Sequence, residues 1–252
     1  MSPPFSFRLP GFSGFLVVMM VVSMPFFGLA FGGSQPFFAK AQSDNDGSAA
    51  SACPPPLVKP VEPFDLASYL GEWYVQAQAP NSYQPVNTLY CVKATYSLED
   101  GATTPQRIRV NNQARTGSVT GPSRGGLPGN NDAFLQAIVR GNNKGELAVG
   151  PRFLPDFLKG PYWIVHYDSD AGEAIITGGA PTQTGENGLC KGARGSFFNP
   201  NGNGEGLWVF TREAMPSEDR VSALTGKVRE LGLDPSVLVR VPQDGCGTFE
   251  TD

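Results

Sequence analysis

The stretch LASYLGEWYVQAQAP, residues 66–80, decides the fold that we expect for this chain. A short turn runs into Gly71 and Trp73, and then Trp73, Val75 and Ala77 alternate with Tyr and Gln side chains. Alternation with a period of two residues is typical of a strand with one buried face. Glycine allows the backbone to turn sharply into the strand. Trp73 is then the first inward-facing side chain, and it is large enough to close the end of whatever the strand encloses.

The chain beyond this stretch consists of short alternating runs separated by Gly, Pro, Asn and Asp, a pattern typical of strands joined by turns. Eight such runs are present, and eight strands suffice to close a small barrel. The sequence therefore predicts an all-β fold, an eight-stranded antiparallel up-and-down barrel. The expected strands lie near residues 72–79, 88–98, 106–113, 133–140, 145–152, 161–168, 172–178 and 206–212.

Short and long connections alternate between these strands. The short ones lie near residues 99–101, 141–145 and 168–172, and the long ones span 80–87, 114–132, 153–160 and 179–205. In an up-and-down barrel, alternate connections lie at the same end. One end is therefore expected to be tight and the other to be surrounded by long loops, with the first strand starting and the last strand finishing at the tight end.

A single helix is expected after the last strand. Pro216 and the acidic residues that follow it are typical of a helix N-terminus. Val221, Leu224, Val228 and Leu231 then recur at intervals of three and four residues. This pattern predicts one amphipathic helix packed on the outside of the barrel, ended by a glycine and followed by a short strand over residues 237–241.

The N-terminal region has the features of a secretory signal. Residues 1–41 contain Arg8 and Lys40 and no acidic side chain, residues 14–31 are largely apolar, and small residues surround Lys40. We expect a signal peptide over 1–41, a Pro- and Ser-rich linker over 42–63 and the barrel domain over 64–252. The expected compartment is outside the cell or the periplasm. A plastid lumen, or a membrane anchor formed by an uncleaved leader, is the alternative.

Charge and cysteine content limit the possible partners. Cleavage after residue 41 would leave 19 − 2 = 17 Lys and Arg against 23 Asp and Glu, a net charge of −6. A mildly acidic protein of this kind has no basic surface for nucleic acid. The four cysteines are widely spaced behind an export signal, which predicts two disulfides among three possible connectivities. Neither a metal nor a cofactor is expected, because one histidine and no clustered cysteines are present.

The order of these parts resembles that of a lipocalin, a member of the calycin superfamily, and within it the group of apolipoprotein D and the bacterial outer-membrane lipocalins. The matching segments are FDLASYLGEWY, VKATYSLEDG, PYWIVHYD and GLWVFTREAMP. The resemblance implies a barrel with one helix that is open at one end and binds a small apolar ligand inside.

Several residue roles follow from the resemblance. Gly71 and Trp73 match the first family motif and Arg212 matches the third, which implies a cation–π contact at the closed end. The second motif survives only as Asp168. The resemblance also implies the disulfides Cys53–Cys190 and Cys91–Cys246.

Strand alternation then gives the expected ligand contacts. Val75 and Ala77 should face inward with Trp73, and an outward Cys91 turns Tyr90, Val92, Ala94 and Tyr96 inward. The expected ligand-binding residues are Tyr96, Trp208, Phe210, Val75 and Ala94, with Phe153 and Phe157 lining the mouth. The facing of His166 is left open between a haem-binding position and an ordinary strand position.

The predicted function is that of a secreted carrier for a small hydrophobic ligand such as a fatty acid, sterol, retinoid, carotenoid or tetrapyrrole, without catalytic residues. The alternative is an enzyme on this barrel that acts on a lipid or carotenoid, for which Asp156, Glu146 and Asp168 are the candidate carboxylates. A third hypothesis is an interaction module that uses loops 114–132 and 179–205. No membrane span is expected in the mature chain, although the open-end loops are candidates for contact with a membrane surface or a protein.

Overall fold

The computed structural model describes residues 53–99, 106–125, 135–193 and 205–249. The expected signal peptide and most of the expected linker lie outside these residues. The main sheet contains eight longer strands, and each corresponds to one of the eight predicted strands. They are β1 Gly71–Gln78, β2 Tyr90–Leu98, β3 Arg107–Arg115, β5 Leu135–Val139, β6 Glu146–Pro151, β7 Gly160–Asp168, β8 Glu173–Thr177 and β11 Leu207–Thr211.

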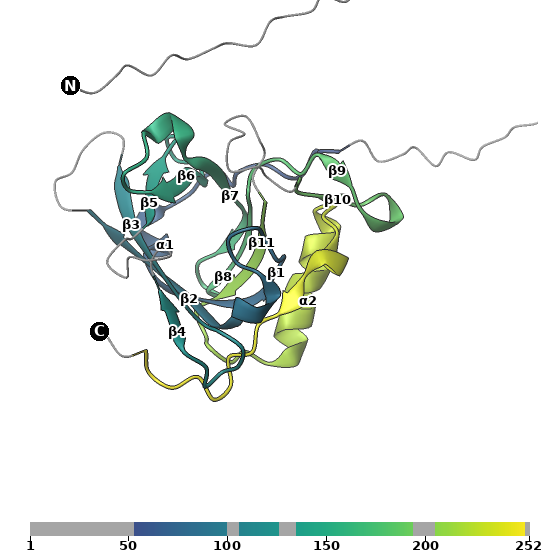
Figure 1. Ribbon diagram of the computed structural model, residues 1–252. Coiled ribbons are helices and arrows are strands. Elements are labelled where there is room, and N and C mark those ends of the chain that lie inside the picture. Colours follow the sequence, from purple (N-terminus) through teal and green to yellow (C-terminus); the bar gives the residue numbers. More distant parts are fainter. Residues whose placement is uncertain (1–52, 100–105, 126–134, 194–204, 250–252) are drawn as a thin grey trace, which may run out of the picture. The chain divides into compact units, whose positions relative to one another are not determined.

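These strands close into a barrel. Each strand pairs antiparallel with its neighbour in the order β1-β2-β3-β5-β6-β7-β8-β11, and β11 pairs with β1 to complete the ring. Figure 1 shows this ring of strands around the centre of the domain. The predicted eight-stranded up-and-down barrel is therefore confirmed.

Four shorter strands add to the barrel or lie apart from it. β4 (Ser123–Gly125) pairs with β3, and β12 (Val239–Arg240) pairs with the end of β1. β9 (Gln183–Thr184) and β10 (Cys190–Lys191) form a separate two-stranded sheet. Single 3-10 turns lie at Val86–Thr88, Asp156–Leu158, Glu186–Gly188 and Pro235–Val237.

Two α-helices complete the fold, and each has a side-chain cap that fixes where it begins. The short α1 (Leu66–Tyr69) precedes β1, and the Asp65 carboxylate accepts hydrogen bonds from the backbone N–H groups of Ala67 and Ser68. The longer α2 (Glu218–Glu230) starts at Ser217, whose side chain accepts a hydrogen bond from the Arg220 N–H. Such caps satisfy backbone donors that have no partner within the helix. No helix in the described ranges is long and apolar enough to span a membrane.

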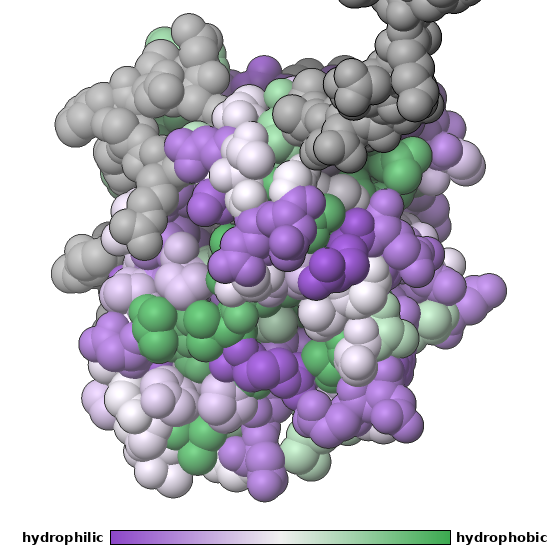
Figure 2. Space-filling model, turned by 90° about the vertical axis from the view of Figure 1, so that its right-hand side faces the viewer, coloured by the Kyte–Doolittle hydropathy of each residue, from purple (hydrophilic) through white to green (hydrophobic). Residues whose placement is uncertain are grey.

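Helix α2 packs on the outside of the barrel, as predicted. Its apolar side chains Val221, Leu224 and Val228 are buried. Leu224 and Val228 belong to a cluster that also contains Val209 and Ile175 of the barrel wall. Figure 2, which looks onto the side of the molecule that carries α2, shows mainly hydrophilic side chains with separate smaller hydrophobic areas. The helix therefore shields one side of the barrel and presents a mostly polar surface to solvent.

The two ends of the barrel differ in the way that the loop lengths predict. The β7–β8 hairpin lies at the same end as α1, because the Gly172 carbonyl accepts a hydrogen bond from Arg212 at the end of β11. The β5–β6 hairpin also lies there, because the Asn143 carbonyl accepts a hydrogen bond from the Phe64 N–H. The described parts of the long connections after β1, β3, β6 and β8 lie at the opposite end. We call the end with α1 the closed end and the other the open end.

Two disulfides tie the flanking segments to the barrel. Cys53 is bonded to Cys190, and Cys91 is bonded to Cys246. The C-terminal segment lies between β1 and β2 where these two strands separate. There the Gln243 side-chain amide donates hydrogen bonds of 2.8 and 2.9 Å to the backbone carbonyls of Val75 and Val92. At the other end of the chain, Val61 exchanges backbone hydrogen bonds with Ile164 and Gly145.

A β-bulge corrects the expected facing of Ala77. Strand alternation predicted that Ala77 would share the inward face with Val75. The register of β1 on β11 instead shifts between these two residues, so that Val75 lies opposite Phe210 and Ala77 lies opposite Val209. The extra residue inverts the facing of the strand beyond it. Ala77 therefore packs in the outer cluster beneath α2, and Gln78, opposite Trp208, faces inward.

A second bulge corrects the expected facing of Tyr90. The β2–β3 register shifts between Tyr90 and Lys93. Tyr90 lies opposite Arg115 and Lys93 lies opposite Gln113. Because Arg115 and Gln113 are two residues apart in β3, Tyr90 and Lys93 lie on the same face of the sheet. Cys91 within this bulge has φ of +53°, a conformation that is uncommon for a residue other than glycine. Tyr90 therefore faces outward, whereas Val92, Ala94 and Tyr96 face inward as expected.

The disulfides should contribute a large part of the stability of the fold. They close loops with sequence separations of 137 and 155 residues, for which chain entropy predicts up to about 5 kcal/mol each. We expect the double substitution Cys91→Ser with Cys246→Ser to lower the free energy of unfolding by several kcal/mol, measured by urea denaturation. Cys53→Ser with Cys190→Ser should lower it by a similar amount, and an unchanged urea midpoint after full reduction would contradict the expectation.

Candidate functional site

The closed end of the barrel is sealed by Arg212 and Trp73. The Arg212 guanidinium lies 3.8 Å from the centroid of the Trp73 ring, and Trp73 is fully buried. A cation over an aromatic face is attracted by the ring quadrupole, by about 0.5–2 kcal/mol. The contact expected from the family resemblance is therefore present.

The same guanidinium also closes the turn between α1 and β1. It donates hydrogen bonds of 2.7 Å to the Ser68 and Leu70 carbonyls and a further one to the Glu72 carbonyl. Gly71 stands between them with φ of +98°, and a β-carbon there would lie 3.3 Å from the Arg212 Nη1 atom. Glycine at this position therefore allows both the turn and the close approach of the guanidinium.

Three tyrosine hydroxyls meet inside the barrel, next to the closed end. The Tyr162 hydroxyl lies 2.7 Å from that of Tyr69 and 2.8 Å from that of Tyr96. Burial is the main cause of the raised pKa of all three phenols. The pKa of Tyr96 is raised to about 12. A buried hydroxyl needs a hydrogen-bond partner, and here each phenol finds its partner in another. The lower interior is therefore apolar except for this one hydrogen-bonded group.

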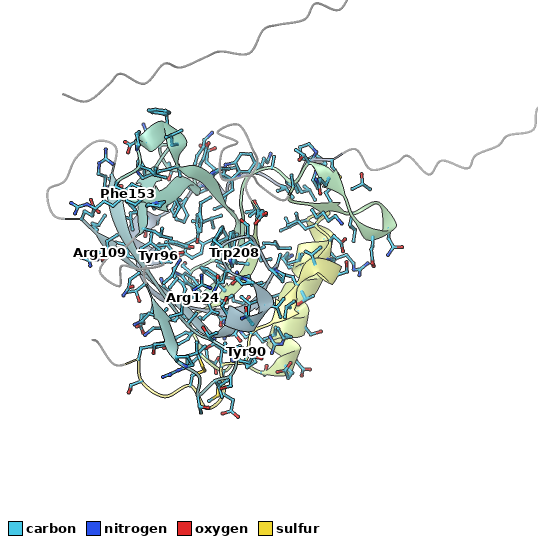
Figure 3. All side chains as sticks on the ribbon, in the orientation of Figure 1. Tyr90, Tyr96, Arg109, Arg124, Phe153 and Trp208 are labelled. Carbon is cyan, nitrogen blue, oxygen red and sulfur yellow. A yellow bond between two sulfur atoms is a disulfide. The ribbon has the colours of Figure 1, made fainter. Side chains whose placement is uncertain are left out.

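Toward the open end, the interior includes apolar side chains that keep some accessible surface. Four apolar residues that pack against the inner cluster keep accessible surface, and they come from the open-end halves of their strands or from the C-terminal segment: Leu135, Val149, Trp208 and Val239. Trp208 stacks on Tyr162 with ring centroids 6.2 Å apart. Figure 3 shows Tyr96 and Trp208 on opposite sides of the interior. Apolar and aromatic side chains with some accessible surface are the kind of lining that suits a small hydrophobic guest.

Tyr83 borders the same opening from the loop between β1 and β2. Its side chain is 54% exposed, yet the surrounding protein, and next to it the Glu205 carboxylate, raise the pKa of this phenol. Tyr96 in the interior contributes as well. Tyr83 therefore lies on the exposed surface of a loop at the open end. The loop itself is held by Arg124, which donates a 2.8 Å hydrogen bond to the Tyr83 carbonyl.

Five of the seven expected ligand contacts lie in the interior. Val75, Ala94, Tyr96 and Phe210 belong to the inner cluster, and Trp208 packs against it. Phe153 and Phe157 are 76% and 73% exposed and lie outside that cluster. Contact of any of these residues with a ligand stays a prediction.

The loop that carries the two phenylalanines is held by a charged network. The Arg107 guanidinium makes two hydrogen bonds, of 3.1 and 2.9 Å, to the Asp156 carboxylate, and the buried Lys159 amine lies 3.0 Å from the same group. Arg107, and to a smaller extent Lys159, lower the pKa of Asp156 to about 2. The loop is thus braced with Phe153 and Phe157 exposed to solvent. The expected contact of the open-end loops with a membrane surface or a protein stays a prediction.

His166 faces the outside of the barrel. The β7–β8 register shifts between Ile164 and His166, and His166 lies opposite Ile175, a residue of the outer cluster. Partial burial lowers the pKa of His166, and Lys227 of α2 lowers it further. The structure therefore places this imidazole beside the outer helix, where it cannot bind a haem inside the barrel.

The candidate carboxylates of the alternative hypothesis do not face the interior. Asp156 is paired with Arg107 and Lys159 in the loop after β6, and Asp168 accepts hydrogen bonds from two N–H groups of the β7–β8 turn. Glu146 precedes the inward-facing Leu147 and lies opposite Trp163 of the outer cluster. The described part of the chain holds no group of three or more His, Cys, Asp or Glu side chains that fits a metal ion.

The sequence analysis missed three interior residues, Tyr69, Tyr162 and Gln78. Tyr69 comes from α1 rather than from a strand, so strand alternation gives no information about it. In β7, both alternating sets of side chains are apolar, and the sequence left the facing of Tyr162 open. Gln78 faces inward only because of the β1 bulge, which no local sequence signal marks.

Two recesses lie near the outer surface of the described part of the chain. One, of about 350 Å³, is lined by the ends of β8 and β11 and by the segments after β9 and α2, including Thr177, Lys191, Leu207 and Leu233. The other, of about 410 Å³, lies at the closed end between α1 and the β2–β3 and β5–β6 turns, with Leu66, Leu70, Leu98 and Val139. Neither contains Tyr96 or Trp208.

Comparison with known proteins finds one matching family and several similar proteins. Residues 64–184 match the lipocalin-like domain family. Temperature-induced lipocalin-1 of Arabidopsis thaliana is 27% identical over 184 residues, which cover 73% of this chain and 81% of that protein. Apolipoprotein D of Cavia porcellus is 28% identical over 131 residues, covering 52% and 59%. The solved structure of lobster apocrustacyanin A1 covers 72% of this chain and 81% of its own, with 15% identity and a TM-score of 0.46.

We expect substitutions at the closed end to affect stability more than ligand binding. Trp73→Ala should lower the free energy of unfolding by about 3–5 kcal/mol, as for other large buried aromatic residues. Arg212→Lys should also destabilise, because an ammonium group cannot reproduce the planar fork of donors. Urea denaturation of both single variants and the double variant measures their coupling. A stable Trp73→Ala protein that has lost ligand binding would overturn this assignment.

The tyrosine group predicts a specific alkaline response. Because the pKa of Tyr69, Tyr96 and Tyr162 is raised in the folded protein, the unfolded chain loses these protons first, near pH 10. Stability should therefore be unaffected by these groups below pH 10 and should fall above it, by about 1.4 kcal/mol per pH unit for each phenol. Tyrosinate absorbance, followed together with circular dichroism, measures this, and Tyr162→Phe is the matched variant. Ionisation of all seven tyrosines near pH 10 in a folded protein would contradict it.

Proposed function

Because residues 64–184 match the lipocalin-like domain family, we propose that the protein binds and carries a small hydrophobic molecule inside its barrel. The observation that carries this proposal is the upper interior, where apolar residues such as Trp208, Leu135 and Val149 keep accessible surface toward the open end. The lower interior is closed by Trp73 and Arg212. A guest would therefore enter from the open end and rest on the aromatic layer of Tyr96 and Tyr162.

The expected affinity is modest if burial of apolar surface alone drives binding. A guest that buries about 350 Å² of apolar surface gains roughly 9 kcal/mol at about 25 cal/mol per Å². Association costs of about 4 kcal/mol or more reduce this to roughly 5 kcal/mol, a sub-millimolar dissociation constant. Tighter binding needs specific polar contacts or close shape fit. The ligand classes in question are fatty acids, sterols, retinoids, carotenoids and tetrapyrroles.

We propose a binding protein rather than an enzyme. The three candidate carboxylates lie on the outer surface, in a braced loop or in a turn, and each is away from the aromatic interior. An enzyme acting on a guest in the barrel needs a catalytic group within reach of that guest. Turnover of a lipid or carotenoid that is abolished by one of Asp156→Asn, Glu146→Gln or Asp168→Asn would favour the enzyme instead.

We also propose that the protein works in an oxidising compartment after export. Both pairs of cysteines are joined in disulfides, and structural disulfides persist mainly in secreted, periplasmic or comparable environments. The apolar N-terminal region of the sequence is consistent with export.

Trp208 provides a direct test of the carrier function. We expect retinol, followed by its own fluorescence, to bind the wild-type protein, and Trp208→Ala to weaken this binding about tenfold or more, because the guest loses an aromatic wall. The matched control is Trp163→Ala, since Trp163 packs in the outer cluster toward α2. Equal loss of binding in both variants, or no effect of Trp208→Ala in a folded protein, would contradict the proposed site.

A further inference from the structure

Part of the C-terminal segment takes the place of a strand in the barrel wall. β1 and β2 pair with each other only from Gly71 opposite Tyr96 to Tyr74 opposite Lys93. Beyond that point, residues 239–243, which we call the wall segment, lie between the two strands. Figure 1 shows the C-terminal segment, in yellow, running from α2 toward the side of the barrel that carries β2 and β4. The C-terminal segment, and not β2, therefore completes the wall next to this half of β1.

The wall segment is hydrogen-bonded to both flanking strands. On the β1 side, the Val241 N–H donates a 3.0 Å hydrogen bond to the Gln76 carbonyl. On the β2 side, the Cys91 N–H donates a 2.9 Å hydrogen bond to the Pro242 carbonyl. The Gln243 side chain bridges the two strands, because it donates to one carbonyl of each. Departure of the wall segment would therefore leave β1 and β2 apart over this length.

The wall segment also contributes to the inner lining of the barrel. Val241 is 3% exposed and belongs to the inner cluster, and Val239 packs against the same cluster. Neighbouring strands of a sheet lie about 4.8 Å apart, so a missing strand leaves the flanking strands about 10 Å apart. A slot of this kind has the width of one extended chain. It would lead from solvent directly to the inner cluster.

Covalent bonds hold the wall segment on both sides. On one side it continues into the turn Pro235–Val237 and α2. On the other side, Cys246 is bonded to Cys91 of β2. Beyond Cys246, the described tail makes non-covalent contacts, such as the 3.1 Å hydrogen bond from Arg115 to the Thr248 carbonyl. Loss of the disulfide would therefore leave the wall segment covalently fixed at one side.

The disulfide is accessible from the side of the tail. Cys91 is buried, whereas Cys246 is partly exposed and stands between Gly245 and Gly247, which are both exposed. The backbone of Cys91 has φ of +53°, a conformation that costs free energy in a residue other than glycine and persists where the surroundings impose it. A thiolate in solvent can therefore approach Cys246, and cleavage of the bond frees Cys91 from one of the contacts that hold its backbone.

We propose that the Cys91–Cys246 disulfide is a redox latch on the wall segment, and that its reduction opens a side passage into the barrel between β1 and β2. This inference rests on the proposed function and adds a way to control the exchange of the guest. While the disulfide is intact, the wall segment cannot leave its place without wider unfolding. After reduction it can swing away on the side of its free end.

The reductant is a dithiol. One of its thiolates bonds to the Cys246 sulfur, and the Cys91 sulfur leaves as a thiolate that takes up a proton. The second thiol of the reductant then displaces Cys246 from the mixed disulfide. Two electrons have passed to the protein, both cysteines end as thiols, and the dithiol ends as a disulfide.

The other disulfide does not hold the barrel wall. Cys190 belongs to β10, in the small sheet outside the barrel, and it is fully buried. Its backbone N–H donates to the Gly232 carbonyl, and its carbonyl accepts from the Asp234 N–H. Reduction of Cys53–Cys190 therefore frees no part of the barrel wall. The variant Cys53→Ser with Cys190→Ser contains the latch as its one disulfide, and we call it the single-disulfide protein.

Limited trypsin cleavage, read by mass spectrometry, tests release of the wall segment without any ligand. The single-disulfide protein is compared in its oxidised form and after reduction by dithiothreitol. Arg240 lies in the wall segment, whereas Arg109 of β3 is paired with strands on both sides and reports global unfolding. Both should be cleaved slowly in the oxidised protein. After reduction, Arg240 should be cleaved about tenfold faster than Arg109 or more, a ratio that corresponds to about 1.4 kcal/mol.

Retinol bound to the same protein tests the passage. Its dissociation rate, followed by its fluorescence on mixing with excess lipid vesicles, should rise about tenfold on reduction, the ratio that about 1.4 kcal/mol produces. Cys91→Ser with Cys246→Ser, in a chain that keeps Cys53–Cys190, should release retinol at the faster rate without reductant. Gln243→Ala removes two hydrogen bonds of the wall segment but keeps the latch. It should release retinol at nearly the slow rate of the oxidised protein.

The outcomes separate the latch from the carrier function. Continued protection of Arg240 after reduction, or equal acceleration at Arg240 and Arg109, overturns the latch. Release of the wall segment with an unchanged retinol dissociation rate overturns the side passage and leaves the carrier function in place. Failure of retinol to bind the oxidised protein contradicts the carrier function and the passage together, whereas cleavage after Arg240 still decides whether the disulfide holds the wall segment.

Discussion

The fold depends on one contact between residues at opposite ends of the barrel sequence, Arg212 at the end of the last barrel strand and Trp73 near the start of the first. The guanidinium covers the tryptophan ring and binds the backbone carbonyls of the turn that leads into β1. An eight-stranded sheet can close only if its first and last strands meet. The contact between Arg212 and Trp73 joins the end of β11 to the start of β1, and it also seals the closed end of the barrel. Gly71 is required there because the guanidinium approaches its backbone closely.

The interior has a part next to the closed end and a part toward the open end. Next to the closed end, Tyr69, Tyr96 and Tyr162 satisfy one another by hydrogen bonds and are removed from water, so this part behaves as an ordinary protein core. Toward the open end, buried side chains such as Val92 and Ala114 lie beside others, such as Leu135 and Trp208, that keep some accessible surface. We propose that a guest would lie against these partly accessible side chains rather than against the tyrosine group.

Polar groups decide what an interior of this kind can select, because apolar surface by itself gives only modest affinity and little discrimination. The Gln78 oxygen is one of several buried side-chain atoms without a hydrogen-bond partner among the described residues, and it has no accessible surface. The side chains that keep accessible surface beside the inner cluster, such as Leu135 and Trp208, are apolar or aromatic. We therefore expect broad selectivity among hydrophobic guests.

The sequence by itself determined the number of strands, the alternation of short and long loops, the outer helix and the residues of the closed end. These features follow from local periodicity, turn residues and a resemblance carried by motifs. Only the tertiary structure decided which side chains face inward at Ala77, Gln78, Tyr90 and His166. The facing of strand residues has a period of two, so one extra residue inverts it. The bulges that insert those residues are set by the pairing of strands far apart in sequence, as β1 pairs with β11, and the local sequence does not mark them.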